Sequence, residues 1–423
     1  MAAPILFLEL FMSKSNRIVQ KTAMLYIMNI AKLIFPLVTQ GYLARVLSAD
    51  GGFAVYTYVR GSVMTYVQLV IDFGFLLSAT RAIAQVREDR EQVGRIVGHV
   101  MVGKGFLSLA ALAVLAILSL FIPLLGSNPV YTALSFLQAM TTIFLVDFLF
   151  HGLERMHVIT IRYFITRVIT VALTFLLIKD DGDLLLIPLL EIIGNLAAIV
   201  WVWLDIHRAQ IPVRFRSWKE TWAMLKDSFV YFLSDIASTA FGALNTLLIG
   251  IVMTERDVSV WGIAMTFVSA VQMMYTPITN SIYPHMVREK SLGVIKKVLM
   301  IFLPVVVIGC VVVWFGAELL VMILAGKELL DAAPLLRWLI PLLFISFLAA
   351  IFGWPVLGAI GKSKETTITT ITAAAAQVAG LVVLLAVDRF TFFNLAMLRA
   401  GTDLLLTVHR MGYCWKYRKE FAK

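Results

Sequence analysis

Apolar residues gather in twelve stretches that fill almost the whole chain and are separated by short polar gaps. A helix of about 20 apolar residues crosses a hydrocarbon core of about 30 Å, and it satisfies its own backbone hydrogen bonds there. The pattern therefore predicts an all-α integral membrane protein with twelve transmembrane helices. The predicted spans are residues 22–44, 55–79, 100–123, 131–151, 163–178, 184–204, 228–253, 259–282, 298–324, 336–360, 366–387 and 391–408.

Basic residues are distributed unevenly between the gaps. Of the 36 Lys and Arg residues, 27 fall at or next to alternate gaps that begin with the amino terminus, and six fall at the intervening gaps. Basic loops stay in the cytoplasm, so we expect a multi-pass protein with both termini cytoplasmic. The formal net charge of +10 then reflects contacts with anionic membrane lipids and does not indicate nucleic-acid binding.

The first eleven residues are apolar but too short to cross a membrane. They lack the early basic residue and the cleavage site of a signal peptide. We expect either that Met12 is the natural start or that this segment lies along the membrane interface.

The longest cytoplasmic gap, at about residues 205–226, divides the chain into six spans and six spans. The halves align faintly at an offset of about 206 residues, which is typical of transporters built from two parallel repeats. The sequence thus predicts two six-helix lobes around a central cavity, with an N-terminal lobe and linker at 1–215 and a C-terminal lobe and basic tail at 216–423.

Polar residues inside the spans fall on single helical faces, because they recur at steps of three and four. Charge that faces lipid costs on the order of 3 kcal/mol, so these faces are predicted to line a wet cavity. Ser, Thr and Gln can instead join helices by hydrogen bonds. Two stripes are Asn29, Lys32, Pro36 and Thr39 in the first span and Asp235, Ser238, Gly242 and Asn245 in the seventh. The predicted substrate-binding residues are Lys32, Arg60, Asn29, Gln68, Asn245 and Gln272.

Two carboxylates, Asp72 and Asp235, lie within spans and are candidates for ion coupling. Burial favours the neutral carboxyl, which would allow either residue to carry a proton. Either could instead neutralise Lys32. Two further acids, Asp147 and Glu191, are expected to serve at helix ends.

Two short motifs resemble sites of enzyme chemistry, but neither has the residues or the surroundings that the chemistry needs. Residues 98–104 match the first seven positions of a phosphate-binding loop, but Gly105 replaces the hydroxyl residue that would hold magnesium. Asp181-Gly182-Asp183 sits in a short outer turn and is expected to be solvated. The sequence therefore predicts no enzyme active site, no cofactor and no metal site.

Several segments resemble the bacterial polysaccharide flippases of the Wzx type. The resemblance covers most of the chain, although the family more often has an acidic residue before the glycine at 51–52 and a polar residue at Ala82. The matching segments are YLARVL at 42–47 with GGF at 51–53, DFGF at 72–75, SATR at 78–81, LDAAPLLR at 330–337 and GKSKE at 361–365.

The resemblance implies an inner-membrane transporter in the superfamily that also holds multidrug and toxic-compound extruders. Such proteins work by alternating access between two lobes. The implied cargo is an undecaprenyl-diphosphate-linked oligosaccharide, the repeat unit of O antigen or a related surface polysaccharide, moved to the outer leaflet. Coupling to H⁺ or Na⁺ and contact with a polysaccharide polymerase and a chain-length regulator are further expectations. Lys32 and Arg60 would donate charge-assisted hydrogen bonds to the diphosphate.

Three other functions remain open at this point. A drug or cation exporter of the same superfamily would favour carboxylates in the cavity, which Lys32 opposes. A membrane polysaccharide polymerase or glycosyltransferase tends to carry a large outer loop, whereas the outer gaps here are short. A scaffold that transports nothing would tolerate changes in the cavity.

Overall fold

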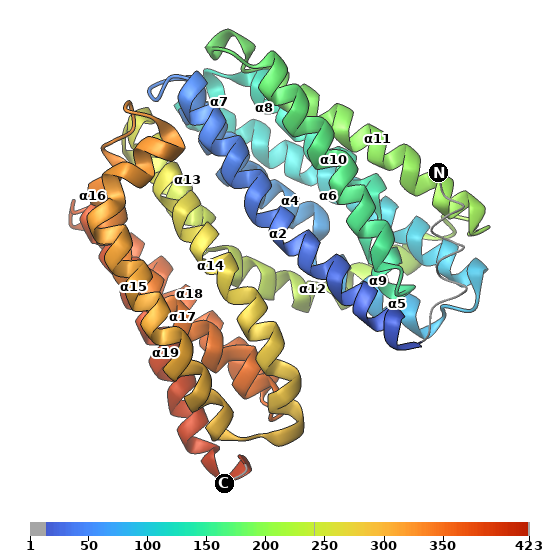
Figure 1. The fold of residues 1–423 in the computed structure, drawn as a ribbon. Helices are drawn as coiled ribbons and strands as arrows, with labels where there is room; N and C mark the ends of the chain where they lie inside the picture. Colours follow the sequence, from blue (N-terminus) through green and yellow to red (C-terminus); the bar gives the residue numbers. More distant parts are fainter. Residues whose placement is uncertain (1–13, 241, 422–423) are drawn as a thin grey trace.

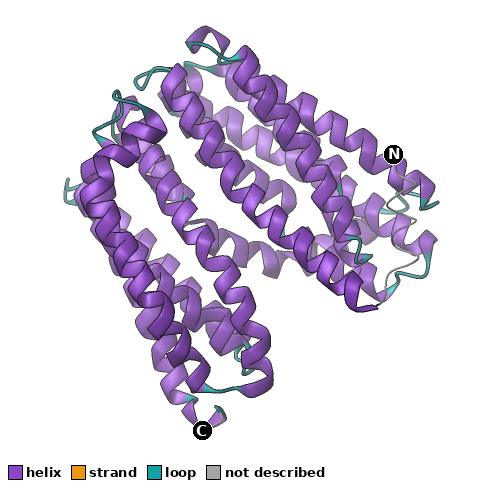
Figure 2. Ribbon diagram, in the orientation of Figure 1, coloured by secondary structure: helices purple, strands orange, loops and turns teal. Residues whose placement is uncertain are grey.

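The computed structural model describes residues 14–240 and 242–421, and the side chains of all of these except 14–29 and 240. Every regular element in this part of the chain is a helix (Figure 2), which confirms the predicted all-α class. Asn29 and the amino-terminal segment before Met12, for which the sequence made predictions, lie outside the described side chains.

The N-terminal half contains helices that correspond to its six predicted spans, several of them broken into shorter pieces. Its helices are α2 (Lys14–Val46), α3 (Gly52–Val55), η1 (Tyr56–Val63), α4 (Met64–Asp72), α5 (Phe75–Gln85), α6 (Arg90–Phe121), α7 (Pro123–Gly126), α8 (Pro129–Thr141), η2 (Thr142–Leu145), α9 (Asp147–Gly152), α10 (Met156–Leu177) and α11 (Leu186–Arg208).

The C-terminal half likewise contains helices that correspond to its six predicted spans. Its helices are α12 (Trp218–Ala240), α13 (Ala243–Val252), α14 (Glu255–Glu289), α15 (Leu292–Ala325), α16 (Ala332–Trp338), α17 (Ile340–Ile351), η4 (Phe352–Gly358), α18 (Ser363–Ala386) and α19 (Phe392–Lys416).

Within the described residues, nine helices are long and apolar enough to cross a membrane, or ten if the bent pair α12 and α13 forms one span. Two more helices, α2 and α19, contain 33 and 25 residues. Each of the twelve predicted spans thus corresponds to a helix or a broken helix. The count of twelve fits this arrangement, although α19 does not meet the same criterion of length and apolar character and the side chains of α2 are described only from Ile30 onward.

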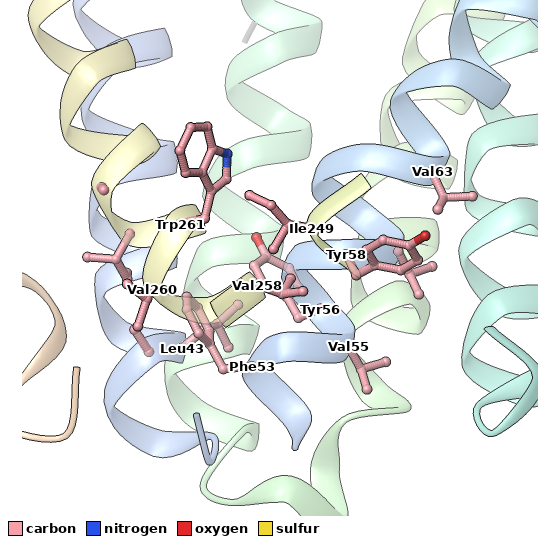
Figure 3. Packing of buried hydrophobic residues seen from close by; sticks show 14 of the residues in the cluster. Leu43, Phe53, Val55, Tyr56, Tyr58, Val63, Ile249, Val258, Val260 and Trp261 are labelled. Carbon is pink, nitrogen blue, oxygen red and sulfur yellow. The ribbon is translucent and has the colours of Figure 1, made fainter. Parts of the chain in front are cut away.

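The helices form two bundles that meet at one end and diverge toward the other (Figure 1). Where they meet, one hydrophobic core contains residues of both bundles, among them Leu43 and Tyr58 of the first and Ile249 and Trp261 of the second (Figure 3). Toward the diverging end, each bundle has a separate core, around Phe75 in the first and Met286 in the second. The short gaps that the sequence assigns to the outer side lie at the joined end.

Hydrogen bonds close the joined end. Ser259 donates to the carbonyl of Ala49 over 2.6 Å, and Ser62 donates to the carbonyl of Ala243 over 2.8 Å. Arg45, at the end of α2, donates to the carbonyl of Leu324 at the end of α15 over 3.2 Å. Polar contacts thus join the same elements as the shared apolar core.

The first turns of α12 pack against the N-terminal bundle. Phe232 stacks on Phe73 with ring centroids 4.4 Å apart, and the hydroxyls of Ser78 and Ser228 are 2.6 Å apart. Gly74 has a positive φ of 73°, and a Cβ there would lie 2.6 Å from Cβ of Tyr231. Only glycine fits both the left-handed conformation and this close approach. Further along, α12 contacts α18 of its own bundle.

Candidate functional site between the two bundles

A hollow of about 530 Å³ lies between the bundles and is lined by both. The first bundle contributes side chains of α2, η1, α4, α10 and α11, and the second contributes those of α12, α13 and α14. The prediction of a central cavity is thereby confirmed.

Cationic side chains from the first bundle face this hollow. Lys32 on α2, Arg60 on η1 and Arg167 on α10 all line it. Nε of Arg60 donates to the Glu191 carboxylate on α11 over 2.8 Å, and the Arg60 side chain remains 28% exposed. Lys32 and Arg167 both lie near the ring of Tyr163, at 5.9 and 5.8 Å from its centroid. Charged side chains this close together are tolerated inside a membrane because they face a cavity or pair with a carboxylate.

A second hollow of about 330 Å³ continues the first into the N-terminal bundle. The two hollows share Arg60, Arg167, Thr170 and Glu191 as lining residues. The second hollow is bordered throughout by elements of the first bundle. The two hollows form one polar region, with a wide part between the bundles and a narrower part inside the first bundle.

Ion pairs and amide hydrogen bonds organise the second hollow. Nζ of Lys104 on α6 lies 2.7 Å from the Asp72 carboxylate. Gln68 donates to Asp72 over 3.0 Å and to the hydroxyl of Thr142 over 2.8 Å. These contacts join α4, α6 and η2 around one carboxylate.

A further pair, Arg162 on α10 and Asp147 at the start of α9, lies on the same hollow with 2.6 Å between Nη2 and Oδ2. The backbone on this side is broken twice at membrane depth, because Phe73 has a φ of 43° and Val146 a φ of 42°. Irregular backbone inside a membrane is tolerated where it borders a wet cavity. The breaks place Asp72 and Asp147 at ends of helical segments that face the hollow.

The combined region is positively charged on one side only. Its described lining contains five cationic side chains and three carboxylates, a formal excess of two positive charges, and all eight belong to the first bundle. They are Lys32, Arg60, Lys104, Arg162 and Arg167 with Asp72, Asp147 and Glu191. The second bundle contributes uncharged side chains, of which Ser238, Thr239, Thr246, Thr266 and Ser269 carry hydroxyls.

Four of the predicted site residues lie together in this region. Lys32 and Arg60 line the first hollow, and Arg60, Gln68 and Asp72 line the second. Lys32, Gln68 and Asp72 were selected from helical periodicity, whereas Arg60 was selected as a charged residue within the second span.

Three others lie elsewhere. Asn245 is fully buried, and its amide oxygen accepts from Gln377 over 3.1 Å, so it joins α13 to α18 instead of lining either hollow. Gln272 and Asp235 are half-buried and are not among the residues that line the two hollows. A polar stripe on a helix face can turn toward a neighbouring helix as readily as toward a cavity.

Sequence reasoning missed several charged residues of the region. Arg162 and Arg167 were not singled out, and Lys104 was considered only as part of an incomplete phosphate-binding motif. Asp147 and Glu191 were assigned to helix ends, whereas the structure places both on the hollows. One signal was available, because Arg60 and Glu191 lie at similar depths in the second and sixth predicted spans.

Comparison with known proteins gives a consistent result. Residues 18–290 match the family model described as "Polysaccharide biosynthesis protein". A putative O-antigen transporter of Escherichia coli K12 is 25% identical over 382 residues, covering 88% of this chain and 91% of that protein. A putative O-antigen transporter of Shigella dysenteriae is also 25% identical, over 316 residues, covering 72% of this chain and 77% of that protein.

Solved structures share the fold at low sequence identity. An inward-facing multidrug resistance transporter of the MATE family, in the MOP superfamily, has a TM-score of 0.68 at 13% identity, with 93% of this chain and 98% of that chain covered. The lipid II flippase MurJ in an inward closed conformation has a TM-score of 0.67 at 13% identity, covering 95% and 89%. The family match and the curated relatives confirm the resemblance drawn from the sequence segments. This chain belongs to the family of polysaccharide biosynthesis proteins.

Proposed function

We propose that this protein is a flippase that moves an undecaprenyl-diphosphate-linked oligosaccharide, the repeat unit of O antigen or a related surface polysaccharide, from the cytoplasmic to the outer leaflet. The observation that carries the proposal is the formal excess of two positive charges on the first bundle's side of the cavity. A diphosphate that links a lipid to a sugar bears two negative charges and needs cationic hydrogen-bond donors once it leaves water.

Arg60 is suited to bind this group. Glu191 accepts from Nε, which fixes the plane of the guanidinium and leaves its two terminal nitrogens for a ligand. Arginine binds phosphate oxygens through two parallel hydrogen bonds, whereas lysine acts as a point charge. We assign the diphosphate to the space between Arg60, Arg167 and Lys32.

The shape of the molecule supports loading from the cytoplasm. The bundles are joined at the end that carries the gaps with few basic residues and diverge toward the end that carries the basic loops. With basic loops and both termini in the cytoplasm, the cavity would open inward in this structure, and transport would require the joined end to separate. Alternating access of this kind moves one bundle against the other around a central site.

The energy for transport would come from an ion gradient or from consumption of the product outside. Among the coupling candidates, Asp72 has a place on the cavity beside Lys104, and Asp235 lies outside it. The ion is H⁺ or Na⁺ in this proposal. A polysaccharide polymerase and a chain-length regulator would receive the flipped repeat unit.

An exporter of cationic drugs would share this fold, as the MATE structures do. The excess of positive charge in the cavity disfavours cationic cargo, so we retain the anionic glycolipid.

The proposal is tested in cells that lack this gene. We expect loss of surface polysaccharide, with single lipid-linked repeat units trapped on the inner leaflet. The intact gene should restore the polymer, and Arg167→Ala, at equal protein level, should not. Single repeat units that reach the outer leaflet without polymerising would show a polymerase instead. Full rescue by Arg167→Ala together with Lys32→Ala would favour a scaffold.

A further inference from the structure

A third hollow, of about 230 Å³, lies inside the C-terminal bundle beside the central cavity. Ser238 lines both, so the two spaces adjoin. The residues that matter for its chemistry are Ser234, Ser238, Trp354, Thr366, Thr367 and Thr370. We call it the tryptophan–hydroxyl hollow. All of its described lining residues are uncharged.

Trp354 provides a flat aromatic wall. It lies in η4 and is 56% exposed. A Cβ at Gly358, one turn later, would lie 2.8 Å from Cε3 of the indole. The glycine therefore lets the ring lie close along its own helix, so that one face is supported while the indole remains accessible.

The local backbone holds this arrangement in place. The chain departs from helical geometry at Gly353, within a π-helical stretch, with a ψ of −122°. Arg410 on α19 donates to the carbonyl of Ala349 over 2.5 Å and to the hydroxyl of Thr370 over 3.1 Å. Wide helical turns of this kind occur frequently at functional sites. Here Arg410 forms hydrogen bonds both to the backbone beside the wide turn and to a residue that lines the hollow.

The hydroxyls of the hollow are oriented as acceptors. Thr367 donates to the carbonyl of Ser363 over 3.1 Å, Thr370 to that of Thr366 over 3.1 Å, and Ser238 to that of Asp235 over 3.0 Å. A hydroxyl has one proton to donate and two lone pairs, so each oxygen can still accept. The hollow thus offers several neutral acceptors around an aromatic face.

This combination matches a sugar ring. Sugars carry hydroxyl donors at their rim and polarised C–H groups on their faces, which are attracted to the negative face of an indole. A phosphate would need a cation and a prenyl tail would need an apolar wall. The volume lies below the range of about 300–1,000 Å³ that is usual for drug-sized ligands, which suits one ring of a longer chain.

We propose that the tryptophan–hydroxyl hollow binds one sugar ring of the transported oligosaccharide while the first bundle binds its diphosphate. This inference rests on the proposed function. The charged diphosphate and the neutral sugar of one ligand would then bind to opposite walls of the cavity. Trp354 would contact the sugar and not the phosphate.

Binding of two lipids to the full-length protein in detergent tests the inference. One probe is the lipid-linked oligosaccharide extracted from cells lacking this gene, and the other is undecaprenyl diphosphate without sugar. Trp354→Ala should weaken binding of the glycolipid about tenfold and leave undecaprenyl diphosphate unchanged. Trp354→Phe, which keeps an aromatic face, should have an intermediate effect. Trp314→Ala, which removes a tryptophan that is 52% exposed on α15, is the matched control and should bind both lipids normally.

The outcomes separate the two proposals. If Trp354→Ala and Trp354→Phe bind both lipids as the unaltered protein does, the sugar site is refuted while the flippase proposal stands. If both lipids lose affinity equally in Trp354→Phe, the residue is structural and the sugar site is likewise refuted. If the unaltered protein binds neither lipid more tightly than phosphatidylglycerol, both proposals fail.

Discussion

The guanidinium of Arg60 lies 2.8 Å from the carboxylate of Glu191 at the junction of the two hollows. The Glu191 side chain is only 11% exposed and pairs with Arg60. Removing Arg60 alone leaves a carboxylate in a poorly solvated place. We expect Arg60→Ala to destabilise the protein by on the order of 2 kcal/mol, less than for a fully buried pair because Arg60 is partly solvated.

A double-mutant cycle in detergent checks this coupling. The double variant Arg60→Ala/Glu191→Ala should recover much of the melting temperature that Arg60→Ala loses. Glu191→Gln should keep an acceptor for Nε while adding to the cavity's positive charge, and should therefore bind undecaprenyl diphosphate more tightly. Additive losses in the double variant would show that the pair is energetically unimportant.

Asp72 and Asp235 differ as candidates for ion coupling. Asp72 is held by Lys104 and Gln68 on the second hollow, whereas Asp235 lines neither hollow. We expect Asp72→Asn to remove the dependence of flipping on a pH or sodium gradient, because the variant lacks the carboxylate to which the proposal assigns ion coupling. Flipping assays in vesicles with imposed gradients measure this. Asp235→Asn serves as the control and should keep the dependence. The reverse pattern would move the coupling site to α12.

The joined end should open during transport. The hydroxyl of Ser259 donates to the backbone carbonyl of Ala49 across the bundles. Cysteines at these two positions should therefore be close enough for a short reducible crosslinker to join them, in a variant whose native Cys310 and Cys414 are replaced. Crosslinking should stop flipping, and reduction should restore it.

A cysteine pair at Arg81 and Arg288, on the diverging ends of the bundles, provides the comparison. It should not react with the same short reagent. Normal flipping by the crosslinked Ala49 and Ser259 pair would mean that the joined end stays closed throughout the cycle.

Gly74 should tolerate no side chain. Its φ of 73° and the short distance from a Cβ to Tyr231 both oppose substitution. We expect Gly74→Ala to lower stability by on the order of 2 kcal/mol and to loosen the first turns of α12, which limited proteolysis would detect. Gly61→Ala is the control, since a Cβ there would meet nothing within 4 Å. Equal protease resistance in the two variants would show that the contact with α12 is dispensable.

The sequence predicted the helices better than it predicted the cavity. Hydrophobic length is a local property, so the predicted spans each found a helix. Lys32 was selected from the helical period of the first span and Arg60 as a charged residue of the second, and both line one hollow. The partner of Arg60 could not be read in the same way, because Glu191 lies 131 residues away and pairs only through tertiary packing. Asn245 was selected from a polar stripe and predicted to line the cavity, but its side chain faces Gln377 on α18.

The breaks in the spans were also hidden. Residues 55–79 and 131–151 read as continuous apolar helices, and the positive φ values at Phe73 and Val146 arise where the chain gives up helical hydrogen bonds to border a polar hollow. The composition of such a segment gives its average apolar character and does not show where its helix is interrupted.

Flipping by the purified protein tests the central claim most directly. Proteoliposomes containing the protein would be loaded with lipid-linked oligosaccharide labelled on its sugar, and the fraction exposed outside would be measured with an impermeant sugar-oxidising reagent. The account predicts that the intact protein equilibrates the leaflets and that Arg60→Ala/Arg167→Ala slows this about tenfold or more, since a hydrogen bond to a charged group contributes about 1.5–3 kcal/mol. Equal rates for the intact protein, the double variant and protein-free liposomes would contradict it.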